Sequence, residues 1–386
     1  MSENHSPFRI FRWSLLVTAI VLVAAGIIGG GEIAAIVAIL AVLEISLSFD
    51  NAVVNATVLV RMSEFWQRLF LTVGVVIAVF GMRLLFPLII VALTAKLNVV
   101  DVVRLALHHP HQYADKLTAA HPAIAAYGGM FLLMIFLDFI LEDRDIQWLG
   151  FLERPLARIG KLDQLSVLVA LVVLVTTAET LAGDHARTVL AAGLLGLATY
   201  LAVNGLSEFF ESTGEEGGDA EENEAGEIEA GGIHGTADDV VKGMPVKVVG
   251  KAALFLFLYL EVLDASFSFD GVVGAFAISQ QIFVIAAGLG VGAMYIRSLT
   301  VFLVRKGTLS DYVFLEHGAH YAIGALAIIL MITIKYDVPE VVTGLIGVGF
   351  IGLAFVSSVI RNRRIAAAGG EGDELPKPEQ TVPAGR

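Results

Sequence analysis

The chain has 386 residues and a formal net charge of −13, from 38 acidic and 25 basic residues. Hydrophobic residues make up 56% and charged residues only 16%, against about 25% charged residues in soluble domains. This composition excludes an ordinary soluble enzyme, and the lack of clustered positive charge excludes a nucleic-acid-binding protein. Because there is no cysteine, disulfides, thiolate metal sites and cysteine nucleophiles are excluded as well.

Ten apolar stretches are long enough to cross a membrane, which takes about 20 residues in a helix. They are 13–30, 33–60, 69–95, 123–141, 165–182, 189–206, 248–278, 282–304, 319–334 and 341–360. The first follows Arg9 and Arg12, a pattern that also fits a signal peptide. Its apolar core is long for a signal peptide and no clear cleavage site follows, so we expect a retained helix.

The basic residues beside these stretches predict their orientation, because Lys and Arg mark the cytoplasmic side. With the N-terminus inside, the inner segments hold sixteen Lys and Arg and the outer segments hold five. We therefore expect a multi-pass protein of the cell membrane (inner or plasma membrane). The lipid bilayer surrounds it, and both termini are cytoplasmic.

The negative charge is concentrated in one segment. Residues 208–240 hold twelve acids and no Lys or Arg, and the rest of the chain has a net charge of −1. Such a composition cannot bury a core. We predict a first transmembrane repeat plus the first span of a second in 1–207, and an acidic cytoplasmic disordered linker in 208–247. The remainder of the second repeat follows in 248–364, and a disordered cytoplasmic tail in 365–386.

An internal repeat relates the two halves. Residues 46–53 read SLSFDNAV and residues 266–273 read SFSFDGVV, identical at five of eight positions at an offset of 220. Upstream, Glu44 matches Asp264, and each copy is followed by a span that contains a lone arginine, Arg83 or Arg297. The two motif spans run in opposite directions in the predicted topology. The sequence therefore predicts an all-α polytopic membrane protein of about ten transmembrane helices in a 5+5 inverted repeat, a common architecture of secondary transporters.

Five acids lie inside the predicted spans, where an ionised carboxylate costs about 2.5–3.5 kcal/mol at the bilayer centre. They are Glu44, Asp50, Glu261, Asp264 and Asp270. Salt bridges to the two arginines would still leave three acids without a positive partner. Those acids must hold protons, face water or bind cations.

The spacing of the acids predicts a local break in each motif helix. Glu44 and Asp50 are six positions apart, which would turn them about 120° away from each other on an unbroken helix. Ser46 and Ser48 offer competing hydrogen bonds to the backbone, and Gly271 loosens the second copy. We expect both helices to bend or unwind near Ser-Phe-Asp, so that both acids point into one cavity.

The chemistry of these side chains limits the ligand. We predict a metal site of Glu44, Asp50, Asn51, Asp264 and Asp270, supported by Ser48, Ser268, Glu261, Arg83 and Arg297. Carboxylate, amide and hydroxyl oxygens suit Mn²⁺, Mg²⁺ or Ca²⁺ rather than Cu(I) or Zn²⁺. These residues do not separate the three hard cations from one another.

The paired motifs resemble those of the TerC family of integral membrane proteins, named for tellurium resistance. The resemblance rests on Glu44 with SFDNAVV at 48–54, on Asp264 with SFDGVVGA at 268–275, and on the arginine-bearing spans. It covers residues 32–360 without the acidic segment. It implies a transporter of the broader LysE-like group, some members of which export manganese, with Glu44, Asp50, Asp264 and Asp270 as site residues. Asn51 matches the asparagine of the family's first motif, whereas Gly271 and the long insert depart from it.

We therefore expect a divalent-cation transporter that exports Mn²⁺ by alternating access, with no enzymatic activity, no catalytic residue and no bound cofactor. One alternative is a membrane scaffold in tellurite or envelope-stress resistance, with the acidic segment as its docking surface. Another is an intramembrane aspartyl protease that uses Asp50 and Asp270 as a dyad. The sequence leaves a homodimer or a membrane partner protein open.

Overall fold

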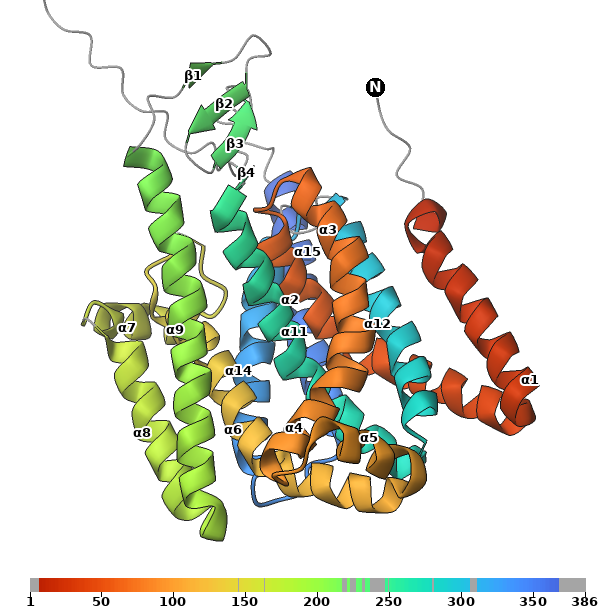
Figure 1. Ribbon diagram of the computed structural model, residues 1–386. Coiled ribbons are helices and arrows are strands. Elements are labelled where there is room, and N and C mark those ends of the chain that lie inside the picture. The colour runs from red at the N-terminus through yellow and green to blue at the C-terminus, as the bar shows by residue number, and fades with distance from the viewer. Residues whose placement is uncertain are drawn as a thin grey trace, which may run out of the picture.

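The computed structural model describes residues 7–144, 146–162, 164–216, 221–222, 227–230, 233–236, 247–248, 250–279, 281–305 and 311–367. These ranges are almost entirely helical (Figure 1). The helices of the first half are α1 (Pro7–Leu47), α2 (Phe49–Leu59), α3 (Glu64–Val76), the π-helical η1 (Ile77–Leu85), α4 (Phe86–Thr94), α5 (Val99–His108), α6 (Pro110–Leu141) and α7 (Gly150–Gly160). Those that follow are α8 (Leu165–Thr180), the 3₁₀ turn η2 (Gly183–His185), α9 (Ala186–Glu216), α11 (Gly250–Ile278), α12 (Ile282–Arg305), α14 (Leu315–Thr333) and α15 (Glu340–Ala367).

The helices confirm an all-α, multi-pass membrane protein. By length and composition, seven helical stretches of the described residues can cross a membrane, or eight if the bent pair α7 and α8 counts as one span. Large apolar side chains such as Trp13, Ile28, Phe80 and Leu195 are exposed on the outside of the bundle. Exposed apolar side chains on long helices are what contact with lipid tails requires.

The predicted count of ten spans is not confirmed, and the differences lie in three places. The first predicted stretch and the second as far as Leu47 belong to one 41-residue helix, α1, and the rest of the second forms α2. The 16-residue α8 is long enough only together with α7, from which it is bent by 103°. The helix α11 holds Glu261 and Asp264 and is not among the seven.

The long helix α1 turns sharply at Gly30, which has φ 75° and ψ −175°. Glycine adopts such a positive φ without steric cost because it has no Cβ. One arm stands at the edge of the bundle and the other runs into it (Figure 1). The outer arm contacts α12, where the hydroxyl groups of Ser14 and Ser298 lie 2.9 Å apart.

Close packing of α1 against α12 depends on two glycines of α12. A Cβ on Gly288 would lie 2.5 Å from the Cβ of Leu40, and a Cβ on Gly292 would overlap the side chain of Glu44. Glycines four residues apart lie on one helix face and let two backbones approach closely in a membrane. This stripe places the inner arm of α1, and with it Glu44, against α12.

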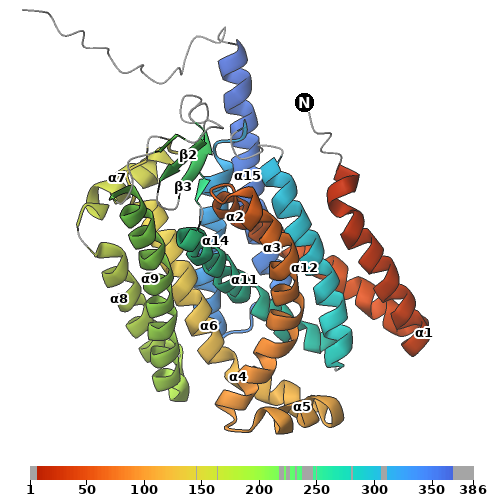
Figure 2. The same cartoon turned by 45° about the horizontal axis from the view of Figure 1, so that its top comes forward.

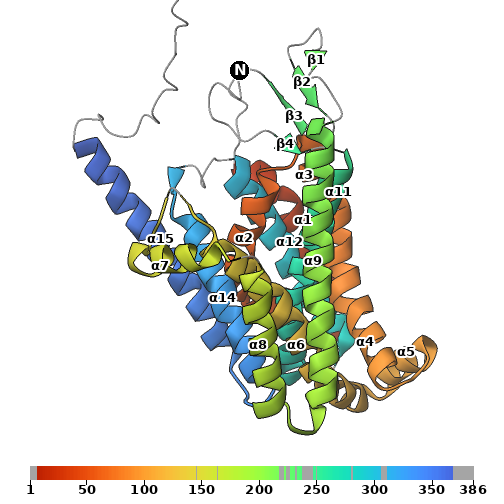
Figure 3. The ribbon, with the colours of Figure 1, turned by 90° about the vertical axis from the view of Figure 1, so that its left-hand side faces the viewer.

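The helix α11 runs through the middle of the bundle in all three views, between α6 and α9 on one side and α2, α3 and α12 on the other (Figures 2 and 3). Its start is held by a backbone bridge. The Val248 amide donates to the Arg61 carbonyl at 2.7 Å, and the Ser63 amide donates to the Val248 carbonyl at 3.2 Å. The second motif is therefore fixed to the turn that follows the first.

Four short antiparallel strands, paired in sequence order, precede α11: β1 (Glu221–Glu222), β2 (Glu227–Ala230), β3 (Ile233–Thr236) and β4 (Lys247–Val248). They lie at the same end of the molecule as the beginning of α1 and the end of α15 (Figures 1 and 2). Half of the predicted disordered linker, 208–247, and most of the predicted tail, 365–386, lie outside the described residues. Both remain predictions.

Candidate functional site

The first motif confirms the expected helix break. Helix α1 ends at Leu47, α2 begins at Phe49, and Ser48 between them has φ −101° and ψ 18°, outside the helical region. The Ser48 amide still donates to the Glu44 carbonyl at 3.0 Å. The break is thus a one-residue bend, and it changes the direction of Asp50 relative to Glu44.

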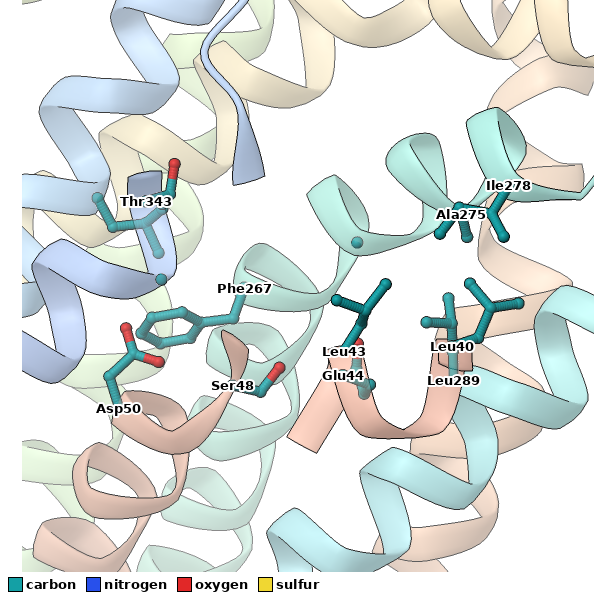
Figure 4. Close-up of a pocket in the computed structure, with 13 residues that line it drawn as sticks. Leu40, Leu43, Glu44, Ser48, Asp50, Phe267, Ala275, Ile278, Leu289 and Thr343 are labelled. Atoms are coloured by element: carbon teal, nitrogen blue, oxygen red, sulfur yellow. The ribbon is translucent and has the colours of Figure 1, made fainter. Parts of the chain in front are cut away.

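This bend brings the two acids of the first motif to one cavity of about 60 Å³ (Figure 4). Glu44, Ser48 and Asp50 supply its polar wall from α1 and α2, together with Thr343 of α15. Apolar residues complete the lining: Leu40, Leu43, Phe267, Ala275, Ile278, Leu289 and Leu326. The prediction that Glu44 and Asp50 face one cavity is confirmed.

The second motif contradicts the expected break, because α11 is continuous from Gly250 to Ile278. Glu261 and Asp264 are three residues apart, a spacing that places both on the same face of an unbroken helix. One arginine can therefore bind both without any bend. The side chains of Ser268 and Asp270 lie outside the described part of the structure, so their predicted roles remain predictions.

Arg297 of α12 binds both of these acids and is only 1% exposed. It donates to the two carboxylate oxygens of Glu261 at 2.9 and 3.0 Å and to Oδ2 of Asp264 at 3.2 Å. Its guanidinium also lies 4.1 Å from the ring centroid of Phe70. A Cβ on Gly74 of α3 would overlap Nη1 of Arg297, so this glycine makes room for the cluster.

Arg83 forms the equivalent pair in the first half. It lies in the π-helical segment η1, is 2% exposed, and donates through Nη2 to Oε1 of Glu44 and through Nη1 to the Ala78 carbonyl at 2.7 Å. A π-helical turn is rare and is found most often at functional sites. Each half of the chain therefore binds its own arginine to its own acid.

Asn51 connects the two halves. Its Nδ2 donates to Oδ1 of Asp264 at 2.9 Å, while its own Oδ1 is buried and has no hydrogen-bond partner among the described residues. Asn55, one turn further along α2, is fully buried, and within the described part of the chain neither its Oδ1 nor its Nδ2 has a partner. Buried polar atoms of this kind are normally satisfied by water or an ion.

Asp50 differs from the other described acids of the site. It is 6% exposed, and Oδ1 accepts a hydrogen bond from the Asn51 amide at 2.9 Å. Among the described residues no Lys, Arg or His forms an ion pair with it. The ring of Phe267 points from α11 toward its carboxylate (Figure 4), and Oδ2 lies against Gly347 of α15.

The described groups leave the site short of positive charge. Four buried carboxyl groups, of Glu44, Asp50, Glu261 and Asp264, stand against the two guanidinium groups of Arg83 and Arg297. If all are ionised, their formal charge is −2. A buried charge without a partner costs several kcal/mol, so this charge must be met by protons or by a cation.

Four of the five predicted metal ligands have described side chains, and these four do not form one cluster. Among the described residues no group of three or more His, Asp or Glu is close enough to hold a metal ion. Asp264 is bound by Arg297 and Asn51, whereas Glu44 and Asp50 line the cavity. Glu44 is also paired with Arg83, so Asp50 is the acid of this described set that lines the cavity without an ion pair.

Two residues of α15 were missed by sequence reasoning. Thr343 lines the cavity, and its buried Oγ1 has no hydrogen-bond partner among the residues that the structure describes. Gly347 lies four residues further along, and a Cβ there would come within 2.5 Å of Oδ2 of Asp50. Neither carries a charge inside an apolar stretch, which was the signal that identified the acids. A Thr followed by Gly at i+4 is too common in membrane helices to be informative.

A comparison with protein-family models matches residues 49–365 to a family described as a protein of unknown function, DUF475. The chain belongs to this family. The match begins at Phe49, so Asp50 and Asp264 lie inside it, whereas Glu44 and Ser48 precede it. No curated protein and no solved structure matched the chain. The family description names no activity.

Proposed function

We propose that this protein transports divalent metal cations across the membrane and binds them at the cavity between the two motifs. One observation carries the proposal: Asp50, a buried carboxylate without an ion-pair partner among the described residues, lines a cavity together with Glu44. Retaining such a carboxylate inside a membrane is costly and is typical of ion pathways. A cation that enters the cavity would neutralise it.

The side chains around the cavity favour a hard cation. Its polar wall consists of the carboxylates of Glu44 and Asp50 and the hydroxyl groups of Ser48 and Thr343. Oxygen ligands suit Mn²⁺, Mg²⁺ and Ca²⁺. A water molecule occupies about 30 Å³ in the liquid, so a cavity of about 60 Å³ admits a cation that keeps part of its hydration shell.

We further propose transport by alternating access, with Mn²⁺ export as the physiological direction. Asp50 follows the bend at Ser48, and helices from both halves line the cavity. Such an arrangement lets one half rock against the other. Export and the preference for Mn²⁺ rest on the resemblance to the TerC family and the LysE-like group. The ten-span, 5+5 inverted-repeat topology with both termini cytoplasmic belongs to the same proposal.

Transport in reconstituted vesicles tests the proposal. We expect vesicles that contain the full chain to accumulate Mn²⁺ down its gradient, and Asp50→Asn to lower the initial rate by at least about tenfold, as expected when a metal site is disturbed. The matched control is Asp184→Asn, the same change at an exposed acid of η2. Equal Mn²⁺ rates in the wild type and in protein-free vesicles, repeated with Mg²⁺ and Ca²⁺, would contradict cation transport. Equal rates in wild type and Asp50→Asn would contradict the site.

A further inference from the structure

The two motifs are related by an offset of 220 residues. Two contacts between the motifs involve positions that correspond at this offset. At this offset Glu44 corresponds to Asp264, and Asn51 corresponds to Gly271. Asn51 touches Asp264 across the interface between the halves. Gly271 lies against Glu44 in the same way, since a Cβ built on it would be 3.2 Å from Oε2. The same two repeat positions are therefore in contact twice. In one contact the acid meets an asparagine, and in the other it meets a glycine.

The half-site around Asp264, which the Asn51 side chain reaches, is called the Asp264 half and is closed. Oδ1 of Asp264 accepts from Nδ2 of Asn51, and Oδ2 accepts from Arg297, so both carboxylate oxygens have a partner. Arg297 is in addition bound by Glu261. Asp264 does not line the cavity. A cation could bind there only by displacing hydrogen bonds that already satisfy the carboxylate.

The half-site around Glu44, which faces Gly271, is called the open half. Oε1 of Glu44 accepts from Arg83, and Oε2 lies where a side chain at position 271 would begin, 3.2 Å from the place of its Cβ. Glu44 and Gly271 both line the cavity. Because residue 271 is a glycine, the Glu44 carboxylate can take this place, and no asparagine amide binds Oε2 as one binds Asp264.

Two polar side chains that line the cavity have no ion pair and no side-chain hydrogen bond among the described residues. Asp50 is 6% exposed and accepts only from backbone amide groups there. Thr343 lines the same cavity, and within the described part of the chain its buried Oγ1 has no hydrogen-bond partner. Polar groups that are buried and unsatisfied are normally completed by a ligand, water or ion. Both observations are independent of the comparison between the repeats.

We propose that the site is asymmetric: one divalent cation binds in the open half, to Glu44, Ser48, Asp50 and Thr343, and Gly271 determines that this half is open. In the Asp264 half both carboxylate oxygens of Asp264 stay bound by Arg297 and Asn51, and this half takes no cation. This inference rests on the proposed function, because it takes the cation as the ligand. It adds that one residue, the glycine at position 271, determines which of the two related half-sites binds the cation.

Equilibrium binding of Mn²⁺ to the full chain in detergent tests the inference without requiring transport. We expect saturable binding of one Mn²⁺ per chain by the wild type. Gly271→Asn puts a side chain in tight contact with Oε2 of Glu44 and displaces this carboxylate. We expect it to weaken binding by at least about tenfold, the scale seen when the groups around a metal ligand are changed.

The matched control is Gly349→Asn, which adds the same side chain on α15 at a glycine with open space around it. We expect it to bind Mn²⁺ like the wild type. Thr343→Val is a second, nearly isosteric variant that removes only the hydroxyl group, and we expect severalfold weaker binding. Size-exclusion elution and thermal unfolding identify any variant that does not fold.

The outcomes separate the inference from the proposed function. Wild-type binding with unchanged affinity in Gly271→Asn and Thr343→Val would leave a cation site in place but overturn its assignment to the open half. Two equivalent Mn²⁺ per chain would overturn the asymmetry. No saturable binding of Mn²⁺, Mg²⁺ or Ca²⁺ by the wild type would overturn the proposed function and this inference with it.

Discussion

At the scale of single residues, the described acids differ in what surrounds them. Glu261 and Asp264 are bound by an arginine, and Glu44 shares one carboxylate oxygen with another arginine. Asp50 accepts from backbone amide groups and has no ion pair among the described residues. The two guanidinium groups meet two of the three negative charges of the other acids inside the protein. Asp50 is the group whose charge depends on what enters the cavity.

Arg297 should be essential for stability, because it neutralises two buried carboxylates. Arg297→Met leaves both without a cation, and breaking a buried ion pair on one side costs about 3–5 kcal/mol. We expect a large fall in the thermal unfolding temperature in detergent. Arg104→Met, at an exposed arginine of α5, should change it little. Equal unfolding temperatures for the two variants would contradict the assigned charge network.

Gly74 should tolerate no side chain, because a Cβ there would overlap Arg297 and lie 2.9 Å from Oε1 of Glu261. Overpacking of this kind costs about 1–3 kcal/mol, so Gly74→Ala should lower the unfolding temperature. The comparison is Gly205→Ala in α9, where nothing lies within 4 Å. There the higher helix propensity of alanine should leave stability equal or slightly raised. A Gly74→Ala protein as stable as the Gly205→Ala protein would refute the close packing.

At the scale of helices, the same Ser-Phe-Asp pattern gives two different backbones. In the first copy the helix ends at Leu47 and restarts at Phe49, while in the second copy α11 continues. Hydrogen bonding by serine permits a break but does not require one. Packing against neighbouring helices determines whether the motif helix breaks. The first motif packs against α15 at Gly347 and against α12 at Gly292. Local sequence does not contain this information, which explains why half of the predicted breaks are wrong.

The outer arm of α1 gives a direct test of helix packing. The hydroxyl groups of Ser14 and Ser298 are 2.9 Å apart, and the chain has no cysteine of its own. We therefore expect the double variant Ser14→Cys and Ser298→Cys to form a disulfide under mild oxidation, since the two side chains lie at bonding distance. Peptide mass spectrometry detects the cross-link. Each single variant is the control, and the absence of a linked peptide in the double variant would contradict this packing of α1.

At the scale of the whole molecule, the distribution of basic residues predicts which end faces the cytoplasm. The short strands, the beginning of α1 and the end of α15 share one end, and α4 and α5 lie at the other (Figure 1). In intact cells, a membrane-impermeant thiol reagent should label Asp101→Cys in α5 but not Glu64→Cys at the start of α3. Both positions are exposed. Labelling of Glu64→Cys alone would reverse the orientation.

Hydropathy predicted the helical, multi-pass architecture, and buried charge predicted Glu44, Asp50, Glu261, Asp264 and both arginines as buried residues. The pairing of these residues could not be predicted, because it depends on how helices far apart in the chain pack. Thr343 and Gly347 carry no charge and gave no signal at all. The difference between Asn51 and Gly271 was visible in the sequence. Its consequence depends on helix packing, which places each residue beside an acid of the other half of the chain.

Crystallography with manganese shows whether a divalent cation binds between Glu44 and Asp50 in the open half of the site. Anomalous diffraction is measured at the manganese absorption edge from crystals of the full chain grown with Mn²⁺. We expect one anomalous peak in the cavity beside these two carboxylates and none at Asp264, together with loss of the peak in Asp50→Asn. A peak beside Asp264 and Arg297, or no peak beside any of these three acids, would show that the proposed site is wrong.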